Sequence, residues 1–190
     1  MGHSQSNKIE NHDKIVRIAA NRFRELGVNG VGVDGLMKEA GLTHGGFYRH
    51  FSSKDELIAE AIERALEDGG AKVLDSVSKG EKITLESLIQ AYLSRIHRDR
   101  LESSCAVTTL ATDVIRSNEK ARSAYTRQVG RYLDLLNQLI SGNEEEVRKK
   151  AISTLSTLVG ALSMARAVND KKLSREILRS ATEDLLERLK

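Results

Sequence analysis

Residues 43–50 carry the side chains best suited to specific binding. Phe47 and Phe51 are four residues apart, so in a helix they share one buried face. The opposite face would present polar or small residues, namely Thr43, His44, Gly46, Tyr48, Arg49 and His50. An exposed face of this kind, led by a helix N-terminus, fits the major groove of double-stranded DNA. The chemistry predicted here is hydrogen bonding to bases and phosphates. Metal binding is not expected, because the i,i+6 spacing of the two histidines separates their rings.

The residues before and after this stretch predict how it is positioned. Leu36 and Ala40 would pack a short helix at 33–40 inward, and Gly41 would allow an abrupt change of chain direction. Leu42 fills the space under the turn, and Thr43 is the expected cap of the second short helix, at 43–50. Two short helices joined in this way form a helix-turn-helix.

The remaining segments also repeat at helical period. A first helix is expected at 12–26, with Ile15, Ile18, Ala19, Phe23 and Leu26 on one face and Gly27 as a left-handed cap. Ser53 and Glu56 form a capping box that opens a long fourth helix. Further helices are expected at 84–100, 105–116, 118–141, 144–168 and 174–189, with Thr84, Asn143 and Ser174 as N-caps.

These patterns predict an all-α fold of about nine helices, because alternating strand patterns are missing from the sequence. Residues 1–54 would form an N-terminal three-helix helix-turn-helix domain. Residues 55–190 would form a larger C-terminal helical bundle. The first 54 residues carry eight basic and five acidic side chains, which gives them the whole net charge of +3.

Three ordered motifs resemble the N-terminal signature of the tetracycline-repressor (TetR) family: Ala40-Gly41-Leu42-Thr43, Phe47-Tyr48-x-His50-Phe51 and Ser53-Lys54-Asp55-Glu56-Leu57. The resemblance covers about residues 12–60. It implies that Thr43, His44, Gly46, Tyr48 and Arg49 face base edges or the adjoining backbone, and that His50 and Lys54 hold phosphates. Gly32 and Met37 depart from the family pattern, which has Ser or Thr and a small alanine there.

The middle of the chain offers a mixture of apolar and hydroxyl side chains that would suit a small-molecule pocket between helices. The predicted ligand-binding residues are Tyr92, Ile96, Cys105, Thr109, Asp113, Tyr125, Val129 and Tyr132. An ordinary core would look the same. Cys105 follows Ser103-Ser104 at an expected helix start, so a second hypothesis is that its thiol senses electrophiles or oxidants.

The last two helices are apolar over much of their girth, which requires cover on two sides. A specific helix-turn-helix generally needs a second copy, so we expect a homodimer. Its predicted interface consists of Leu155, Leu158, Leu162, Ile177, Leu178, Ala181 and Leu185. The alternative is that both helices are buried within one subunit.

Composition and motifs narrow the function. The sequence contains no Walker loop, GxSxG or HExxH motif, so an enzyme is not expected, nor is a cofactor or a metal. The single cysteine, the polar start and the lack of a long apolar segment suit a cytoplasmic protein without membrane contact. The expected function is a repressor that binds a palindromic operator in double-stranded DNA and is released by a small-molecule inducer. The alternative is a helical protein-interaction module that has lost DNA binding.

Overall fold

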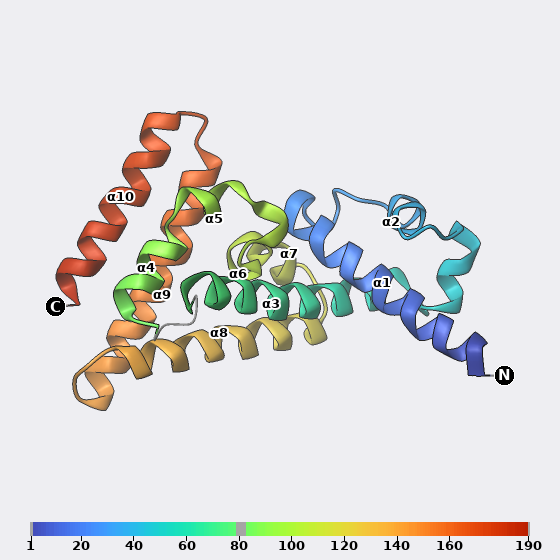
Figure 1. Ribbon diagram of the computed structural model, residues 1–190, viewed down its shortest axis with the longest axis horizontal. Helices are drawn as coiled ribbons and strands as arrows, with labels where there is room; N and C mark the ends of the chain where they lie inside the picture. Colours follow the sequence, from blue (N-terminus) through green and yellow to red (C-terminus); the bar gives the residue numbers. More distant parts are fainter. Residues whose placement is uncertain (1, 79–82, 190) are drawn as a thin grey trace.

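The computed structural model describes residues 2–78 and 83–189, and within these ranges the regular structure is entirely helical. Figure 1 shows an elongated molecule with the N-terminus at one end and the C-terminus at the other. The helix-turn-helix occupies the right of that view, and the last helices occupy the left. The all-α prediction is therefore confirmed.

Helix α1 (Gly2–Leu26) forms the back of the N-terminal head. Ile15, Ala19 and Phe23 are almost fully buried, as the periodicity predicts. The helix begins well before His12, the predicted start, because polar residues continue it outward as an exposed extension. Leu26, predicted to be on the buried face, is 55% exposed, since the helix ends there and Gly27 turns away at φ +74°.

The turn of the helix-turn-helix lies between α2 (Val33–Glu39) and the 3₁₀ helix η1 (His44–Arg49). Gly41 has φ +74°, its N–H donates to Lys38 O at 3.0 Å, and the N–H of Leu42 donates to Met37 O at 2.9 Å. This pair of bonds is the Schellman arrangement, which ends a helix at a left-handed residue. The sequence predicted the turn correctly but not the helix type, because η1 is a 3₁₀ helix. The Thr43 side chain makes no capping bond.

Helix α3 (Lys54–Ser78) joins the head to the bundle and packs against α1 and α8. The Ser53 hydroxyl accepts from Glu56 N at 3.1 Å, whereas the Glu56 carboxylate accepts from the N–H and hydroxyl of Ser52 instead of from Ser53 N. Further along, a Cβ on Gly69 would lie 2.7 Å from Ser104 O. Glycine at this position therefore allows α3 to approach the loop after η2 closely.

The bundle contains more and shorter helices than predicted. The segment predicted as one helix at 84–100 is α4 (Leu85–Tyr92) and α5 (Arg95–Asp99), separated where Ser94 Oγ accepts from His97 N at 3.1 Å. The 3₁₀ helix η2 (Leu101–Ser103) follows. The segment 105–116 divides into α6 (Ala106–Thr109) and α7 (Ala111–Ile115).

Three long helices complete the chain: α8 (Glu119–Leu139), α9 (Glu144–Ala167) and α10 (Lys171–Arg188). Thr84 and Asn143 cap α4 and α9 as predicted. Ser174 is not the cap of the last helix, because Asp170, four residues earlier, is its N-cap and Ser174 lies in the first turn. Ser174 is instead buried and donates to Ala165 O at 2.5 Å.

Replacing Gly41 with alanine should destabilise the head, because an L side chain at φ +74° costs about 1–2 kcal/mol. Gly45→Ala is the matched control, since a Cβ there meets nothing within 4 Å. Urea unfolding of the two variants should show a lower midpoint for Gly41→Ala and an equal or higher one for Gly45→Ala. Equal midpoints for the two variants would contradict the assigned turn.

Candidate nucleic-acid interface and regulatory core

The outward face of η1 is open to solvent. Thr43, His44, Arg49 and Lys54 are exposed, and the Tyr48 side chain is 71% exposed although it is aromatic. On the opposite side Phe47 and Phe51 are buried with ring centroids 5.4 Å apart. Of the sequence-predicted DNA-binding residues, five are therefore exposed, whereas Gly46 and His50 are half-buried.

An ion pair between His44 Nδ1 and Asp34 Oδ1 links η1 to the first turn of α2. Both side chains are largely exposed. The sequence analysis did not predict a role for Asp34. The turn between α2 and η1 brings Asp34 and His44 together, and no helical spacing in the sequence indicates this contact. The pair fixes the direction of the His44 ring on the exposed surface.

His50 is unlike the other candidates because its ring is partly enclosed. Its Nδ1 is buried without a hydrogen-bond partner among the described residues, and its ring centroid lies 6.3 Å from that of His12. Burial, together with the neighbouring cationic groups, lowers the pKa of His50 below its ordinary value. The imidazole is therefore neutral at pH 7, and it would reach a phosphate as a hydrogen-bond donor and not as a cation.

The two departures from the family pattern are accommodated locally. Met37 is fully buried, and its methyl group would lie 3.7 Å from a Cβ placed on Gly46, an ordinary van der Waals contact, so the adaptable side chain fits beneath η1. Gly32 takes the N-cap position of α2 with φ −87° and offers no side-chain cap.

Two polar contacts tie the head to the bundle. Arg24 of α1 is 2% exposed and donates from Nε to Glu102 O at 2.8 Å, from Nη1 to Ala65 O at 3.0 Å, and from Nη2 to Asn21 Oδ1. Burial lowers the pKa of Arg24. Asp113, predicted as a ligand-binding residue, instead accepts from the N–H of Val28 at 3.1 Å. The contacts of Arg24 with Glu102 and of Val28 with Asp113 therefore connect the N-terminal head to the bundle.

Most of the other predicted ligand-binding residues lie in one tight core around α6. Cys105 Sγ is 3.3 Å from Tyr132 Oη, the Tyr92 and Thr108 hydroxyls are hydrogen-bonded at 2.8 Å, and Tyr125 donates to Val107 O at 2.9 Å. Burial raises the pKa of Tyr92 and of Tyr132, so both phenols are neutral at physiological pH.

Free space in this core is small. The cavity beside Tyr92 and Tyr132 measures about 20 Å³, which is room for about one water molecule. Thr109 Oγ1 is buried without a partner among the described residues, and Val129 is half-buried. Ile96 does not belong to this core. Its side chain is 69% exposed, because the short helix α5 turns it toward solvent.

The Cys105 thiol is fully buried. An electrophile reaches it only if the helices around it move apart. The role of Cys105 as a sensor stays a prediction.

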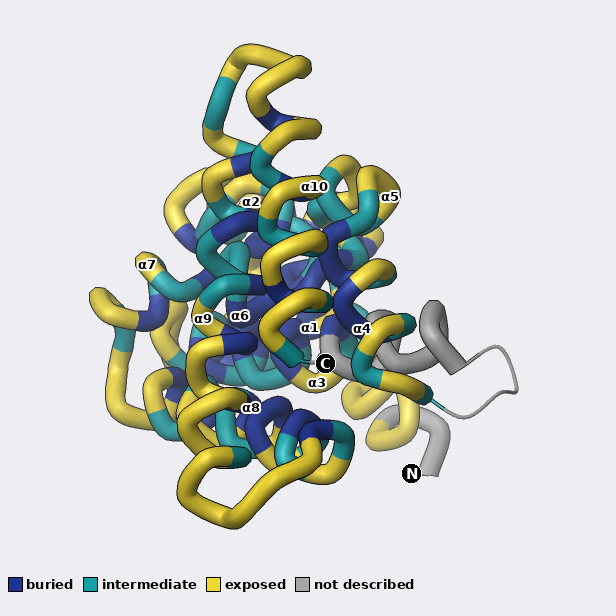
Figure 2. The backbone as a smooth tube through the Cα atoms, turned by 90° about the vertical axis from the view of Figure 1, so that its left-hand side faces the viewer, coloured by how far each residue is buried: buried dark blue, intermediate teal, exposed yellow. Residues whose placement is uncertain are grey.

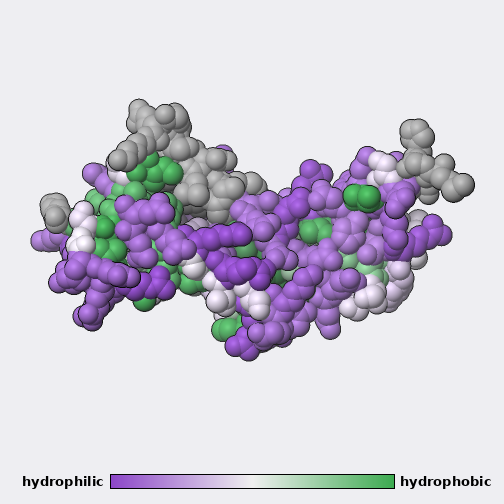
Figure 3. Space-filling model, turned by 90° about the horizontal axis from the view of Figure 1, so that it is seen from below, coloured by the Kyte–Doolittle hydropathy of each residue, from purple (hydrophilic) through white to green (hydrophobic). Residues whose placement is uncertain are grey.

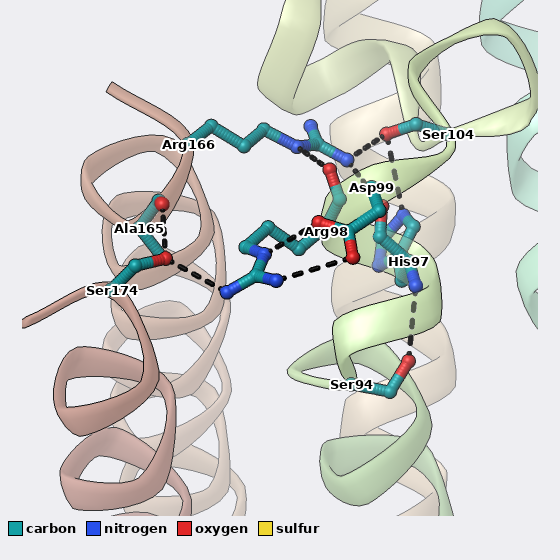
Figure 4. A network of polar contacts seen from close by, with 8 residues as sticks. All are labelled: Ser94, His97, Arg98, Asp99, Ser104, Ala165, Arg166 and Ser174. Atoms are coloured by element: carbon teal, nitrogen blue, oxygen red, sulfur yellow. Dashed lines mark hydrogen bonds and ion pairs between the residues drawn. The ribbon is translucent and has the colours of Figure 1, made fainter. Parts of the chain in front are cut away.

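His97 and Arg166 organise a polar network between α5 and α9 (Figure 4). The N–H of Cys105 donates to His97 Nε2 at 3.1 Å, so His97 Nδ1 carries the proton and donates to Tyr92 O at 2.7 Å. Arg166 donates to Arg98 O, His97 O and Ser104 Oγ at 3.1, 2.6 and 2.6 Å. Burial lowers the pKa of His97 to about 4. Sequence reasoning missed this network, because the acceptors are mainly backbone carbonyls.

The predicted dimer interface is mostly core. Leu155, Leu158, Leu162, Leu178 and Leu185 are at most 8% exposed within one chain, and Ile177 and Ala181 are half-buried. These leucines pack α9 and α10 against each other and against α4 and α8. The side chains that α9 turns outward are different ones, including Ile152 at 46% and Met164 at 55% exposure.

Neither a metal site nor a membrane-spanning helix is found in the part of the chain that the structure describes. No group of three His, Cys, Asp or Glu side chains there is arranged to hold a metal ion. None of the helices there combines the length and apolar character needed to cross a membrane.

Sequence comparison finds the N-terminal domain in known regulators. A family model described as bacterial regulatory proteins, tetR family, matches residues 15–61. The HTH-type transcriptional repressor KstR2 of Rhodococcus jostii is 28% identical over 117 residues, which are 60% of this chain and 56% of that protein. The HTH-type transcriptional regulator SAB2452 of Staphylococcus aureus is 40% identical over 58 residues, 30% of this chain and 31% of that protein. The matched segments thus span 56% and 31% of the length of these two relatives.

Structure comparison extends the likeness over the whole chain. A transcriptional regulator of the TetR family from Cytophaga hutchinsonii superposes with a TM-score of 0.79 at 16% identity, covering 97% of this chain and 96% of the other. A TetR transcriptional regulator from Chloroflexus aurantiacus gives 0.77 at 24% identity, covering 96% and 95%. The reduced form of E. coli NemR gives 0.73 at 21% identity, covering 94% and 96%. At these identities the likeness shows the fold.

The neutral His97 makes stability depend on pH. Its folded-state pKa of about 4 lies below the ordinary value of 6.5, so the unfolded chain binds the proton first as the pH falls. The contribution of neutral His97 to the stability of the folded state is fully present above pH 6.5 and is lost between pH 6.5 and 4. Urea titrations should show the free energy of unfolding decreasing over this window, by up to about 1.4 kcal/mol per pH unit from this group.

His97→Gln keeps a donor and an acceptor but does not titrate, so the slope of stability against pH should be shallower than in the unsubstituted protein. An identical slope in the variant would show that His97 does not titrate as described.

Proposed function

We propose that the chain is a DNA-binding transcriptional regulator of the tetR type, a repressor whose affinity for its operator is lowered by a small molecule, because residues 15–61 match the model of that family. The observation that carries this proposal is the exposed face of η1, within the matched segment. There Tyr48 is 71% exposed and Arg49 is open to solvent, while Phe47 beneath them is buried.

The exposed face suits direct reading of base edges. Arg49 supplies a guanidinium, and His44 and Tyr48 supply ring donors and an aromatic surface. Lys54 lies at the N-terminus of α3, where its charge adds to the helix dipole at a phosphate. Base contacts give sequence preference, and phosphate contacts give register and salt dependence.

A second copy is needed for a palindromic operator, since one recognition element covers only a half-site. We propose that the dimer forms through the outward face of α9 and α10 and not through the leucines of the core. This face carries Ile152, Met164 and, on α10, Leu173 at 42% exposure. Gly160 lies on the same helix, and a Cβ there would meet nothing within 4 Å, so a partner helix could approach closely. Figure 2 shows exposed positions recurring along α9 and α10.

The small molecule would act by shifting a conformational population. The core around Tyr92 and Tyr132 has little free space, so a ligand entering its cavity would have to displace the helices that line it, α4, α8 and α9. Helix α6 packs against α8 and α9 and also against α7, so the displacement would pass to α7. Asp113 of α7 holds Val28 N, and Glu102 O of η2 holds Arg24. Displacement of either element would therefore move the head. A coupling of only about 1–3 kcal/mol changes operator affinity about 5- to 150-fold.

A gel-shift titration with DNA fragments from upstream of the encoding gene and its neighbours tests the proposal. Selective binding that weakens with salt supports a regulator. A lack of binding to every fragment at low salt overturns it and favours the protein-interaction module.

Arg49→Ala should weaken binding to the selected fragment by about 5- to 150-fold, the range for losing one good base contact. Arg179→Ala removes the same charge from α10, far from η1, and should bind as the unsubstituted protein does. Equal losses in both variants would show that net charge and not the η1 face governs binding.

Met164→Glu should convert a dimer into a monomer, because it places a charge on an exposed apolar position of α9 within the proposed contact. Ile115→Glu is the matched control, since Ile115 is 73% exposed on α7, outside that face. Sedimentation equilibrium should give a dimer for the unsubstituted protein and for Ile115→Glu. A dimer that survives Met164→Glu places the interface elsewhere.

A further inference from the structure

A groove of about 840 Å³ opens between α5 and the junction of α9 and α10. It lies in the C-terminal half of the molecule, away from the helix-turn-helix (Figure 1). Its walls hold one acidic side chain, Asp99, and six basic ones: Arg95, Arg98, Arg100, Arg166, Lys171 and Arg175. This charge imbalance is much larger than that of the chain as a whole.

Two of the basic groups are engaged by the protein. Arg98 pairs with Asp99 through Nε at 2.7 Å and donates to Ser174 Oγ at 2.9 Å (Figure 4). Arg166 uses Nε and Nη2 on backbone carbonyls and Ser104 Oγ, and no carboxylate of a described residue lies within ion-pair distance of it. Its Nη1 is buried without a hydrogen-bond partner among the described residues.

The other four cations project from three elements that meet at the groove. Arg95, Arg100, Lys171 and Arg175 are exposed, and none has a carboxylate of a described residue within ion-pair distance. Arg95 and Arg175 also line an adjoining groove of about 590 Å³ along α10. Like charges held this close repel one another, and an anion between them removes the repulsion.

The groove is not purely polar. Ile96 is 69% exposed beside the arginines, and Leu101 and Val168 add apolar surface. A ligand that covers Ile96 gains from removing apolar surface from water. The volume is in the range of pockets that hold small organic molecules.

We propose that this groove is a binding site for a small organic anion, with more than one negative charge from carboxylate or phosphate groups on an apolar body. Guanidinium groups bind both kinds of anion through paired hydrogen bonds. The site is separate from the buried core around Tyr92 and Tyr132, which is almost filled and neutral.

The groove adjoins a contact to the head. Leu101 lines it, and the next residue, Glu102, accepts from Arg24 of α1 through its carbonyl. Arg166 holds the neighbouring carbonyls of His97 and Arg98. An anion that draws Arg166 or Arg100 toward itself would shift η2 and so alter the position of α1. This regulatory step rests on the proposed function, whereas binding of the anion does not.

The part of the proposed dimer face around Met164 would leave the groove open. Met164 and Arg166 are two residues apart on α9, about 200° around the helix, so they point to opposite sides. A partner covering Met164 therefore leaves the Arg166 side accessible.

Isothermal titration of the full chain tests binding directly. The probes are phthalate, phenyl phosphate and the uncharged benzyl alcohol, all at constant ionic strength. Saturable binding of phthalate or phenyl phosphate, but not of benzyl alcohol, is expected, and the stronger of the two identifies the acidic group. No saturable binding of either anion at millimolar concentration, or equal binding of benzyl alcohol, overturns the proposal. Binding of poly-glutamate without either small anion also overturns it and assigns the groove to an acidic protein segment.

Arg95→Gln/Arg175→Gln should weaken anion binding by about tenfold or more, because two charge-assisted contacts are lost. Arg148→Gln/Lys150→Gln removes the same charge from exposed positions near the start of α9 and should leave affinity unchanged. Thermal unfolding of both variants shows whether they remain folded. Equal weakening in the two variants would reduce the effect to net charge and overturn the site.

Operator binding with and without the tighter anion tests the regulatory step. The anion should change operator affinity of the unsubstituted protein but not that of Arg95→Gln/Arg175→Gln. An unchanged affinity in the unsubstituted protein overturns regulation and leaves the binding site standing. A protein that binds the anion but no DNA refutes the proposed function alone.

Discussion

Arg24 joins three parts of the molecule through one buried guanidinium. It donates to Asn21 in its own helix, to Ala65 O in α3 and to Glu102 O in η2. Burying a cation without hydrogen-bond acceptors raises the free energy of the folded state by several kcal/mol. We therefore expect these contacts to form together and to break together. Helix α1 is thereby held in one orientation on the bundle. Because α2 packs on α1 and η1 packs on α2, the direction of the exposed η1 face follows from that orientation.

The same contact limits how a signal can reach the head. Gly69 brings α3 against Ser104–Ala106, and Asp113 holds the turn after α1 at Val28 N. The loop from η2 to α7 therefore touches the head at two points and the connecting helix at a third. Hydrophobic residues gather mainly at the bundle end, whereas the head shows small isolated patches on a hydrophilic surface (Figure 3). This distribution suits a head that contacts a polyanion and a bundle that contacts apolar partners.

Sequence reasoning succeeded where the structural cause is local. Gly41 ends α2 and Ser53 caps α3 through hydrogen bonds between residues a few positions apart. The local sequence is therefore enough to predict these features. It failed where the structure depends on residues that are far away in the sequence. The apolar stripe of α9 is real, but the pattern cannot distinguish cover by α4 and α8 from cover by a second copy, and Leu158 proved to be core. The division into α4 and α5 at Ser94 was not predicted. The helical period of the sequence is continuous there, and only the Ser94 cap interrupts the helix.

Several polar contacts were not predicted, because the sequence does not mark the partner of each side chain. Arg24 and Arg166 bind backbone carbonyls, which every residue offers, so no partner residue type marks them in the sequence. The Asp34–His44 pair depends on the angle between α2 and η1. Asp113 fits the composition of a ligand pocket, but its carboxylate accepts a hydrogen bond from Val28 N in the head. Such roles become visible only when the helices are placed relative to each other.

The central claim is that two copies of the η1 face lie on one side of a DNA duplex, about 34–36 Å apart. Equilibrium binding to a selected palindromic duplex, with and without about five base pairs inserted between its half-sites, tests this most directly. The insertion turns the half-sites to opposite sides of the duplex, so affinity should fall toward that of unrelated DNA. Equal affinity for the two duplexes would contradict the claim.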